Sequence, residues 1–203
     1  MTGAATVDLP GVQLEAGDHI CAFYRAPEER DDILIPYLLG GLVSGSKCTC
    51  VVDSCAPTHV LERLSQTVDV SPMCEQGQLE VLDSDSTYFD GGGFLPERML
   101  KFWAGKARWS GSTDDNVVRN IGDMTWAHRD KPGVEDLAMY ESELNRIIGG
   151  YPQIVLCMYD MNRCDGETVL DVLKTHPKAM LGGMVIDNPY FLEPDDFLAS
   201  RTR

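Results

Sequence analysis

The sequence has few basic residues, few aromatic residues and no long hydrophobic run. Of its 203 residues, 17 are Lys or Arg and 32 are Asp or Glu, which gives a formal net charge of -15 at pH 7. A protein that binds nucleic acid needs a basic face, so this charge argues against nucleic acid as a direct partner. No apolar stretch approaches the roughly 20 residues of a membrane-spanning helix, so we expect no membrane partner.

The N-terminal segment lacks the basic region and the long apolar stretch of a secretory signal. We therefore expect a cytoplasmic protein whose seven cysteines are reduced thiols. Cys48 and Cys50 form a CxC pair with Cys55 close behind, but CxxC and a second pair at zinc-finger spacing are both missing. Two residues apart on a strand face the same side, so burial is the simpler interpretation. We assign no metal ligand and no cofactor.

Sequence motifs of common enzyme classes are also missing. The chain contains no G-x-S-x-G, no H-E-x-x-H and no G-x-G-x-x-G after a predicted strand. Gly91–Phe94 (GGGF) follows a predicted strand but lacks the dinucleotide-binding spacing. The sequence therefore predicts a non-catalytic protein.

What is present is an alternation of short apolar segments with amphipathic segments. Such an alternation predicts a three-layer α/β fold, with a largely parallel central sheet between helices. We expect one domain, 1–203, with a core over about 17–191 and flexible tails at both ends. The predicted strands are His19–Tyr24, Lys47–Asp53, Gln78–Ser84, one within Val117–Ala127, Gln153–Asp160 and Ala179–Asp187; the predicted helices are Asp31–Gly45, Ala56–Thr67, Leu95–Trp109, Val134–Gly150 and Asp165–His176, with a loop at 111–116.

The segment GLVSGSKC, Gly41 to Cys48, nearly matches the phosphate-loop pattern G-x-x-x-x-G-K-[ST]. Ser46 replaces the second glycine, and Cys48 replaces the hydroxyl residue. A working phosphate loop follows a strand and opens a helix, whereas this segment ends a predicted helix and enters a strand. The position after the first strand, Arg25–Asp32, has no Gly, no Lys and a surplus of carboxylates, which repel phosphate. We predict weak or no ATP binding.

Five segments in order resemble one known family. They are GDHICAFYRAPEERDDILIPYLLGGL, GDMTWA, YESELN, CMYDMNRCDGETVLDVLKTHPKAMLGG and NPYF, and together they cover nearly the whole chain from about Gly17 to Phe191. The family is the MEDS domain, the methanogen/methylotroph sensory domain of bacterial and archaeal signalling proteins. The resemblance implies a RecA/KaiC-like fold without a phosphate-binding loop. It also implies a sensor of small organic molecules, such as simple hydrocarbon derivatives, and it supplies no catalytic residues.

Many members of that family carry a helix-turn-helix or kinase module on the same chain, and the sequence shows no such module here. The resemblance therefore implies either a fragment of a longer regulator or a domain that acts on a separate protein, such as a histidine kinase or a transcription regulator. A homo-oligomer is expected only by analogy with KaiC-like proteins.

Ligands of open α/β sheets bind beyond the carboxyl ends of the strands, in pockets that mix rings with a few polar groups. The residues selected on this basis also have structural interpretations. Trp126 and Tyr159 can be core aromatics, and the acids can be helix caps. Glu141 can be part of a solvated helix face, and His19 can be a hydrogen-bonded histidine near a sheet edge. His176, at a helix end, is interpreted as structural, because a cation there suits the helix dipole. The predicted ligand-binding residues are His19, Phe23, Tyr24, Arg25, Asp123, Trp126, Glu141, Tyr159, Asp160 and Asn188.

Three alternatives to a ligand sensor stay open from the sequence. One is a nucleotide-binding remnant of a KaiC-like ATPase with an unusual phosphate site. Another is a scaffold that only pairs with itself or with a kinase. The third is a metal- or redox-sensing thiol module that uses Cys48, Cys50 and Cys55, with Cys21 or Cys157 as further members.

Overall fold

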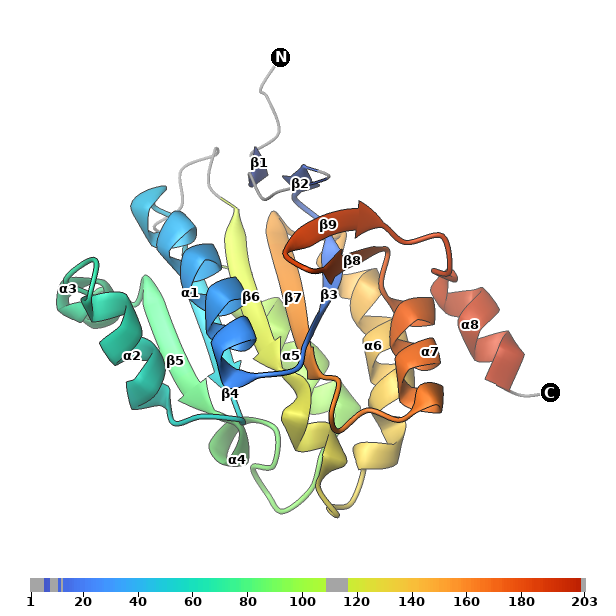
Figure 1. Cartoon of the computed structure of the whole chain (residues 1–203). Coiled ribbons are helices and arrows are strands. Elements are labelled where there is room, and N and C mark those ends of the chain that lie inside the picture. Colours follow the sequence, from blue (N-terminus) through green and yellow to red (C-terminus); the bar gives the residue numbers. More distant parts are fainter. Residues whose placement is uncertain (1–5, 8–10, 12, 109–116, 202–203) are drawn as a thin grey trace.

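A seven-stranded sheet forms the centre of the computed structural model, which describes residues 6–7, 11, 13–108 and 117–201. The strand order is β5-β4-β6-β7-β3-β8-β9 (Figure 1). Neighbouring strands pair in parallel up to β8, and β8 pairs with β9 in an antiparallel hairpin. The strands are β3 (His19–Tyr24), β4 (Cys48–Val52), β5 (Leu79–Asp83), β6 (Val118–Asp123), β7 (Gln153–Asp160), β8 (Lys178–Leu181) and β9 (Met184–Asp187), with a separate pair β1 (Thr6–Val7) and β2 (Leu14–Glu15).

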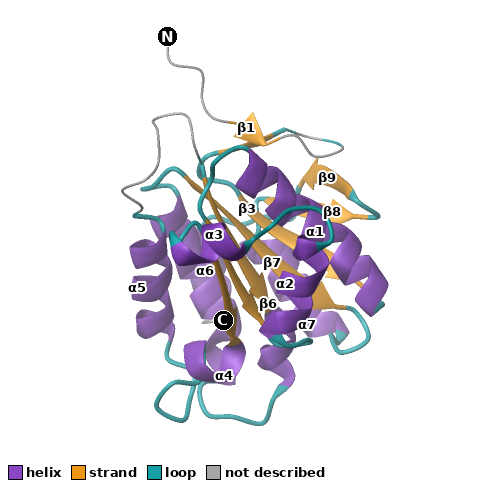
Figure 2. Ribbon diagram, turned by 90° about the vertical axis from the view of Figure 1, so that its left-hand side faces the viewer, coloured by secondary structure: helices purple, strands orange, loops and turns teal. Residues whose placement is uncertain are grey.

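Helices cover both faces of this sheet, which gives the three layers that the sequence predicts (Figure 1 and Figure 2). Helices α1 and α2 bury their apolar residues on one face, and α5, α6 and α7 bury theirs on the other. No helix among the described residues is long and apolar enough to cross a membrane. The helices are α1 (Pro27–Val43), α2 (Pro57–Ser65), α3 (Ser71–Glu75), α4 (Ser84–Thr87), α5 (Pro96–Lys106), α6 (Leu137–Ile148), α7 (Gly166–Thr175) and α8 (Pro194–Arg201), with 3-10 turns η1 (Met124–His128) and η2 (Val134–Asp136).

The alternation of side chains along the two central strands decides which residues face α6 and α7. In β7, Leu156 packs on the α1 side of the sheet and Cys157 on the α6 side. In β3, Cys21 packs on the α6 side, and it lies beside Cys157 in the strand register. His19 is two residues before Cys21 and therefore faces the same side. Because β3 lies between β7 and β8, the expectation that His19 is near a sheet edge is wrong.

Helix α1 begins four residues earlier than the sequence analysis predicts. Ala26 is its N-cap, Pro27 opens it, and Glu28 and Glu29 lie in its first turn. Proline suits the first helical position and acids suit the helix N-terminus, so PEER is a better start than the predicted Asp31. Pro36 lies inside the helix.

The near match to a phosphate loop serves packing in the structure. As predicted, the segment ends α1 and leads into β4. A Cβ atom on Gly41 would lie 2.6 Å from Sγ of Cys48 and 2.7 Å from Cδ of Arg119, so this position needs glycine for close approach. Lys47 is buried, and its Nζ pairs with Oε1 of Glu80 at 2.9 Å. Gly41 and Lys47 therefore serve packing and ion pairing in the fold and are not available to bind a phosphate.

The C-terminal part of the chain differs from the prediction in two ways. The predicted strand Ala179–Asp187 is a hairpin, because Gly182 and Gly183 adopt positive φ angles of 56° and 77° and reverse the chain. Within the segment expected as a flexible C-terminal tail, Pro194–Arg201 form helix α8 and bury Phe197. Trp109, the predicted loop at 111–116 and most of the predicted N-terminal tail lie outside the described residues.

Candidate functional site

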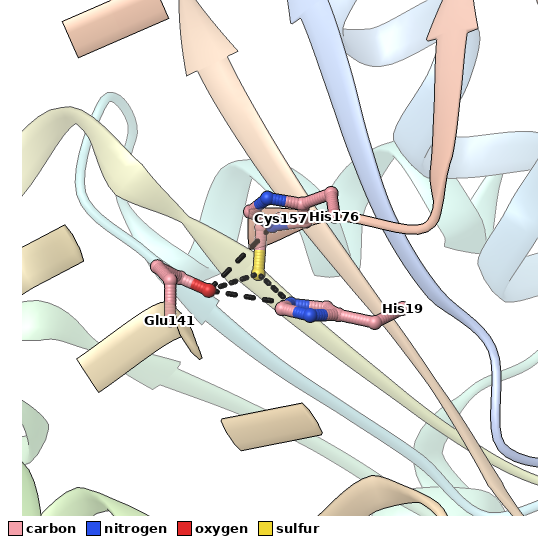
Figure 3. Close-up of side chains that lie close together, drawn as sticks. All are labelled: His19, Glu141, Cys157 and His176. Carbon is pink, nitrogen blue, oxygen red and sulfur yellow. Dashed lines mark hydrogen bonds and ion pairs between the residues drawn. The ribbon is translucent and has the colours of Figure 1, made fainter. Parts of the chain in front are cut away.

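Four buried polar side chains meet between the sheet and α6 (Figure 3). They are His19, Glu141, Cys157 and His176, and one nitrogen, sulfur or oxygen atom of each lies within 4.8 Å of all the others. Within the described part of the chain, no other group of three or more His, Cys, Asp or Glu residues satisfies the same criterion. His19, Glu141 and His176 are 0 % exposed and Cys157 is 3 % exposed, so this cluster is a feature of the interior.

Each member of the cluster comes from a different part of the chain. His19 opens β3, Cys157 lies in the middle of the neighbouring β7, and Glu141 projects from the buried face of α6. His176 follows α7 directly, just before β8. The cluster therefore lies within the layer between sheet and helices, and not beyond the carboxyl ends of the strands, where the sequence analysis placed the site.

Short distances link the polar atoms of the cluster. Oε2 of Glu141 lies 3.2 Å from Nε2 of His19 and 3.5 Å from Nε2 of His176. Sγ of Cys157 lies 3.4 Å from Nε2 of His19 and 3.7 Å from Oε2 of Glu141. The two imidazole rings are also close, with centroids 4.0 Å apart. The two nitrogens, the sulfur and the oxygen thus converge on a common centre.

Asn145 decides which nitrogen of His19 carries the hydrogen. Its amide nitrogen donates to the backbone carbonyls of Glu141 and Thr175, at 3.1 and 2.8 Å. Its Oδ1 must therefore be the atom that lies 3.1 Å from Nδ1 of His19, and an amide oxygen only accepts. Nδ1 of His19 is the donor, and Nε2 presents a lone pair to the cluster.

His176 has the same tautomer for a similar reason. Its Nδ1 lies 2.7 Å from the carbonyl oxygen of Val172, which can only accept. Nε2 of His176 therefore also presents a lone pair to the cluster. Asn188, which the sequence analysis predicts as a ligand-binding residue, instead holds this segment: its amide nitrogen donates to the carbonyls of Leu173 and His176 at 2.6 and 2.7 Å.

Burial disfavours the charged forms of the cluster members. It lowers the pKa of His19 from 6.5 to about 4 and that of His176 from 6.5 to about 3. It raises the pKa of Glu141, against the opposing effects of His176, Tyr159 and Cys157. The interpretation of His176 as a cation at a helix end is therefore wrong, and so is the alternative of Glu141 on a solvated face.

A cavity of about 280 Å³ lies against the cluster, between α6 and α7. Glu141 belongs both to the cluster and to the cavity wall. The wall is formed by Ala127, His128, Val134, Glu135, Leu137, Ala138, Glu141, Asp165, Glu167, Thr168, Asp171, Val172, Thr175 and Arg201. This wall combines apolar side chains with hydroxyl groups, one arginine and five carboxylates.

A second and larger cavity, of about 710 Å³, lies at the carboxyl ends of β3 and β7. Phe23 lies near the end of β3, and Arg25 follows that strand directly. Met161 and Asn162 follow β7. The turn of the β8–β9 hairpin closes its far side. Of the predicted ligand-binding residues, Phe23 and Arg25 line this cavity, whereas His19 and Glu141 belong to the buried cluster.

Asp123 and Tyr24 belong to a hydrogen-bond network at the ends of β3, β4 and β6. Oδ2 of Asp123 accepts from the backbone amides of Asp53 and Ser54 at 3.1 and 2.7 Å. Its Oδ1 accepts a hydrogen bond from the backbone amide of Thr125, and this bond caps the N-terminus of η1. The same oxygen lies 3.5 Å from the hydroxyl of Tyr24. Asp123 is therefore a helix cap, which is the structural interpretation that the sequence analysis gave for the acids. It lines neither cavity.

The remaining predicted residues also lie away from both cavities. Trp126 is fully buried, and its ring stacks on Tyr88 with centroids 4.4 Å apart. Tyr159 is buried edge-on against His176, at 5.9 Å between centroids. Asp160 accepts from the amide of Asn162 at 2.9 Å and holds a turn, while Asp165 caps α7. Trp126 and Tyr159 are the core aromatics that the alternative interpretation describes.

The thiol candidates from the sequence separate in the structure. Cys48 and Cys50 are fully buried in the apolar core on the α1 side, and Cys55 is half-buried at its margin. Cys157, considered only as an accessory thiol, is the cysteine that meets histidines and a carboxylate. Sequence reasoning missed His176 and undervalued Cys157. The available signal was the alternation in QIVLCMYD, which puts Cys157 on the α6 face with Tyr159.

Comparison with known proteins agrees with this fold. The model of the MEDS family, the methanogen/methylotroph, DcmR sensory domain, matches residues 18–177. The chain is 31% identical over 185 residues to the transcriptional repressor DcmR of Methylorubrum extorquens, over 85% of this chain. It spans 63% of the length of that repressor.

Solved structures with a RecA-like fold are similar to this chain at low sequence identity. An uncharacterized protein from Pyrococcus horikoshii, crystallised with an unknown peptide, has a TM-score of 0.62 at 16% identity, over 82% of this chain and 77% of that one. The flagellar accessory protein FlaH from Methanocaldococcus jannaschii has a TM-score of 0.63 at 11% identity, over 90% and 84%. The chain therefore has the predicted RecA-like fold.

Proposed function

Since this chain belongs to the MEDS family of sensory domains, we propose that it is a non-catalytic sensor that binds a small organic molecule in the cavity between α6 and α7. Its output would be prokaryotic signal transduction or transcription regulation, through a separate histidine kinase or transcription regulator. The relationship to a protein named as a transcriptional repressor supports a regulatory role.

The observation that carries this proposal is the size and lining of the cavity. A volume of about 280 Å³ lies just below the usual range for ligand pockets, about 300–1,000 Å³, and suits a small molecule. Leu137, Ala138 and Val172 supply apolar wall, while Thr168 and Thr175 supply hydroxyl groups. Charged groups of Glu135, Asp165, Glu167, Asp171 and Arg201 lie in the same wall, and polar groups at fixed places orient a bound ligand.

The C-terminal helix offers a route by which binding can reach a partner. Arg201 of α8 lies in the cavity wall and pairs with Asp171 of α7. Arg146 of α6 pairs with Asp195 of α8 at 2.7 Å. A ligand that prefers one arrangement of α6 and α7 would therefore also bias α8, which is a shift between existing populations.

A filled-cavity variant tests the proposal. Ala138→Phe places a ring in the α6–α7 cavity, and Val169→Phe does the same in the larger cavity at the strand ends. We expect thermal-shift screening of small organic molecules to find a ligand whose affinity falls at least about tenfold in Ala138→Phe and is unchanged in Val169→Phe. The opposite pattern would place the ligand in the larger cavity and contradict the proposed site.

The ATPase alternative is weakened by the start of α1. Glu28 and Glu29 occupy its first turn, where a phosphate would bind. The guanidinium of Arg30 is already engaged by Asp31 at 2.7 Å and by Ser54 at 2.9 Å. We expect no γ-phosphate-dependent binding of ATP with magnesium by calorimetry.

The remaining sequence-based expectations are kept as proposals. They are a single domain over 1–203, a cytoplasmic location and no direct contact with nucleic acid.

Leu181, Met184 and Ile186 are exposed on the β8–β9 hairpin at the sheet edge, and such apolar edges favour self-association. Sedimentation of Ile186→Lys beside the parent chain tests whether this edge forms a homo-oligomer.

A further inference from the structure

We propose that His19, Glu141, Cys157 and His176 together bind a divalent transition-metal ion of the zinc class. The ligand atoms are Nε2 of each histidine, Sγ of Cys157 and a carboxylate oxygen of Glu141 (Figure 3). From the sequence we expected no metal ligand, so this changes that expectation. It goes beyond the proposed sensing of an organic molecule and does not depend on it, because protein side chains supply all four ligands.

The distances match those of a tetrahedral zinc site. Zn²⁺ binds nitrogen and oxygen at about 2.0–2.2 Å and thiolate sulfur at about 2.3 Å, so neighbouring ligand atoms lie about 3.3–3.6 Å apart. Nε2 of His19 lies 3.2 Å from Oε2 of Glu141 and 3.4 Å from Sγ of Cys157. Oε2 of Glu141 lies 3.5 Å from Nε2 of His176 and 3.7 Å from Sγ of Cys157. The two remaining separations, from His176 to His19 and from His176 to Cys157, lie within 4.8 Å, so these ligands would draw together around an ion.

The hydrogen bonds behind the ligands are those of a metal site. Metal-binding histidines usually donate their other N–H to a carbonyl or carboxylate, which fixes the ring and its tautomer. Here Asn145 accepts from Nδ1 of His19 at 3.1 Å, and the carbonyl of Val172 accepts from Nδ1 of His176 at 2.7 Å. Both Nε2 lone pairs consequently face the cluster, where each lies 3.2–3.5 Å from Oε2 of Glu141.

Hydrogen bonding alone leaves the cluster incompletely satisfied. Among the described residues, Nε2 of His176 and Oε1 of Glu141 are buried without a hydrogen-bond partner. The thiol of Cys157 can donate to Nε2 of His19 at 3.4 Å, but Nε2 of His176 has no such donor. Such orphaned buried groups each cost about 1–3 kcal/mol. A metal ion is an acceptor of lone pairs from both nitrogens, the sulfur and the carboxylate at once.

The charges of the ligands also suit a divalent ion. A carboxylate and a thiolate sum to -2, the two imidazoles are neutral, and an M²⁺ ion makes the buried assembly neutral. Neutrality matters because an uncompensated charge in the interior is strongly disfavoured. Binding would release the protons of Cys157 and Glu141 to solvent.

The chemistry of the ligands selects the class of metal. Calcium and magnesium take six or more oxygen ligands, whereas imidazole and thiolate favour zinc and its first-row neighbours. Four protein ligands without an open position are typical of a structural zinc site. Such an ion would join β3, β7, α6 and the segment after α7, next to the cavity wall that contains Glu141.

Zinc content tests the proposal directly. The whole chain is expressed in zinc-supplemented medium, dialysed, and analysed for metal by mass spectrometry beside protein concentration. We expect about one Zn²⁺ per chain. Cys157→Ser should weaken Zn²⁺ binding at least about tenfold, whereas Cys21→Ser should not. Cys21 is the matched control, because it lies beside Cys157 in the register and is equally buried without belonging to the cluster.

Cobalt substitution of the unmutated chain covers the case in which a variant fails to fold. Co²⁺ in this site should give the visible bands of tetrahedral cobalt and a thiolate-to-cobalt charge-transfer band in the near ultraviolet. Less than about a tenth of an ion per chain after zinc reconstitution, with no thiolate band, would overturn the proposal. So would wild-type zinc affinity in folded Cys157→Ser. Neither result depends on whether the Ala138→Phe experiment finds an organic ligand.

Discussion

The side-chain oxygen of Asn145 accepts a hydrogen bond from Nδ1 of His19 at 3.1 Å, between residues 126 positions apart in the chain. The amide nitrogen of the same asparagine donates to the carbonyl of Thr175 at 2.8 Å. One side chain of α6 therefore positions the start of β3 and the end of α7 together. This makes Asn145 the residue that aligns two of the four cluster members without belonging to the cluster.

Replacing Asn145 should destabilise the fold. Asn145→Ala leaves the buried Nδ1 hydrogen of His19 and the carbonyl of Thr175 without their partner, at a cost of about 1–3 kcal/mol each. We expect the free energy of unfolding in urea to fall by that order. Asn162→Ala is the control, since Asn162 is exposed and should lose less than about 1 kcal/mol. Equal losses in the two variants would contradict the role of Asn145.

Acid should destabilise the metal-free protein between about pH 6.5 and pH 4.5. His19 titrates at about 4 and His176 at about 3 when folded, against 6.5 in the unfolded chain. The unfolded state therefore binds more protons in this range, and each histidine reduces stability by up to about 1.4 kcal/mol per pH unit as the pH falls. Glu141, whose pKa is raised, acts in the opposite direction but is one group against two.

Urea unfolding in the presence of a chelator, at pH 7.5 and at pH 5, measures this effect. We expect the parent chain to lose on the order of 2 kcal/mol between these pH values. The double variant His19→Gln and His176→Gln should lose much less, since glutamine does not titrate. If the parent chain is as stable at pH 5 as at pH 7.5, the two histidines take up protons in the folded state as readily as in the unfolded state, which would contradict the prediction.

Two glycine substitutions should have opposite effects on stability. Gly41→Ala would place Cβ 2.6 Å from Sγ of Cys48 and 2.7 Å from Cδ of Arg119, and such overpacking costs about 1–3 kcal/mol. Gly105→Ala, in α5, meets nothing within 4 Å and should gain about 0.5–1 kcal/mol from helix propensity. Melting temperatures of the two variants check the pair, and a neutral Gly41→Ala would contradict the packing role of this glycine.

Thiol reactivity should follow burial and not the CxC motif. Cys74 is exposed and should react first with a thiol reagent, followed slowly by Cys55 and Cys164, whose pKa values burial raises to about 11. Cys48 and Cys50 should react only after unfolding, because both are buried. Time-resolved labelling with peptide mapping checks the order, with Cys74→Ser as control. Early labelling of Cys48 or Cys50 would revive the thiol-sensor alternative.

The layers of the fold could be predicted from the sequence, because local periodicity determines them. The apolar run in Gln153–Asp160 and the amphipathic pattern of α6 depend on neighbouring residues only. The hairpin at Gly182 and the early start of α1 at Pro27 were missed, although glycine pairs and N1 prolines carry both signals.

The candidate site was only partly predictable, because it depends on which strands pair. His19 and Glu141 were selected individually, but nothing in their local sequence indicates that β3 lies between β7 and β8. Without that register, Cys157 and His176 cannot be placed beside them. The rule that ligands bind beyond the carboxyl ends of strands selected Phe23 and Arg25, which line the larger cavity instead.

The position of β3 has a consequence for how the chain folds as it is synthesised. Strand β3 ends at Tyr24, but its two neighbours in the sheet are completed only at Asp160 and Leu181. A nascent chain must therefore emerge past Asp160 before β3 gains its first partner, and past Leu181 before it gains the second. Such late, long-range pairing slows folding and leaves unpaired strand edges exposed in the meantime. C-terminal truncations that end before β8 should for this reason aggregate instead of forming a smaller native domain.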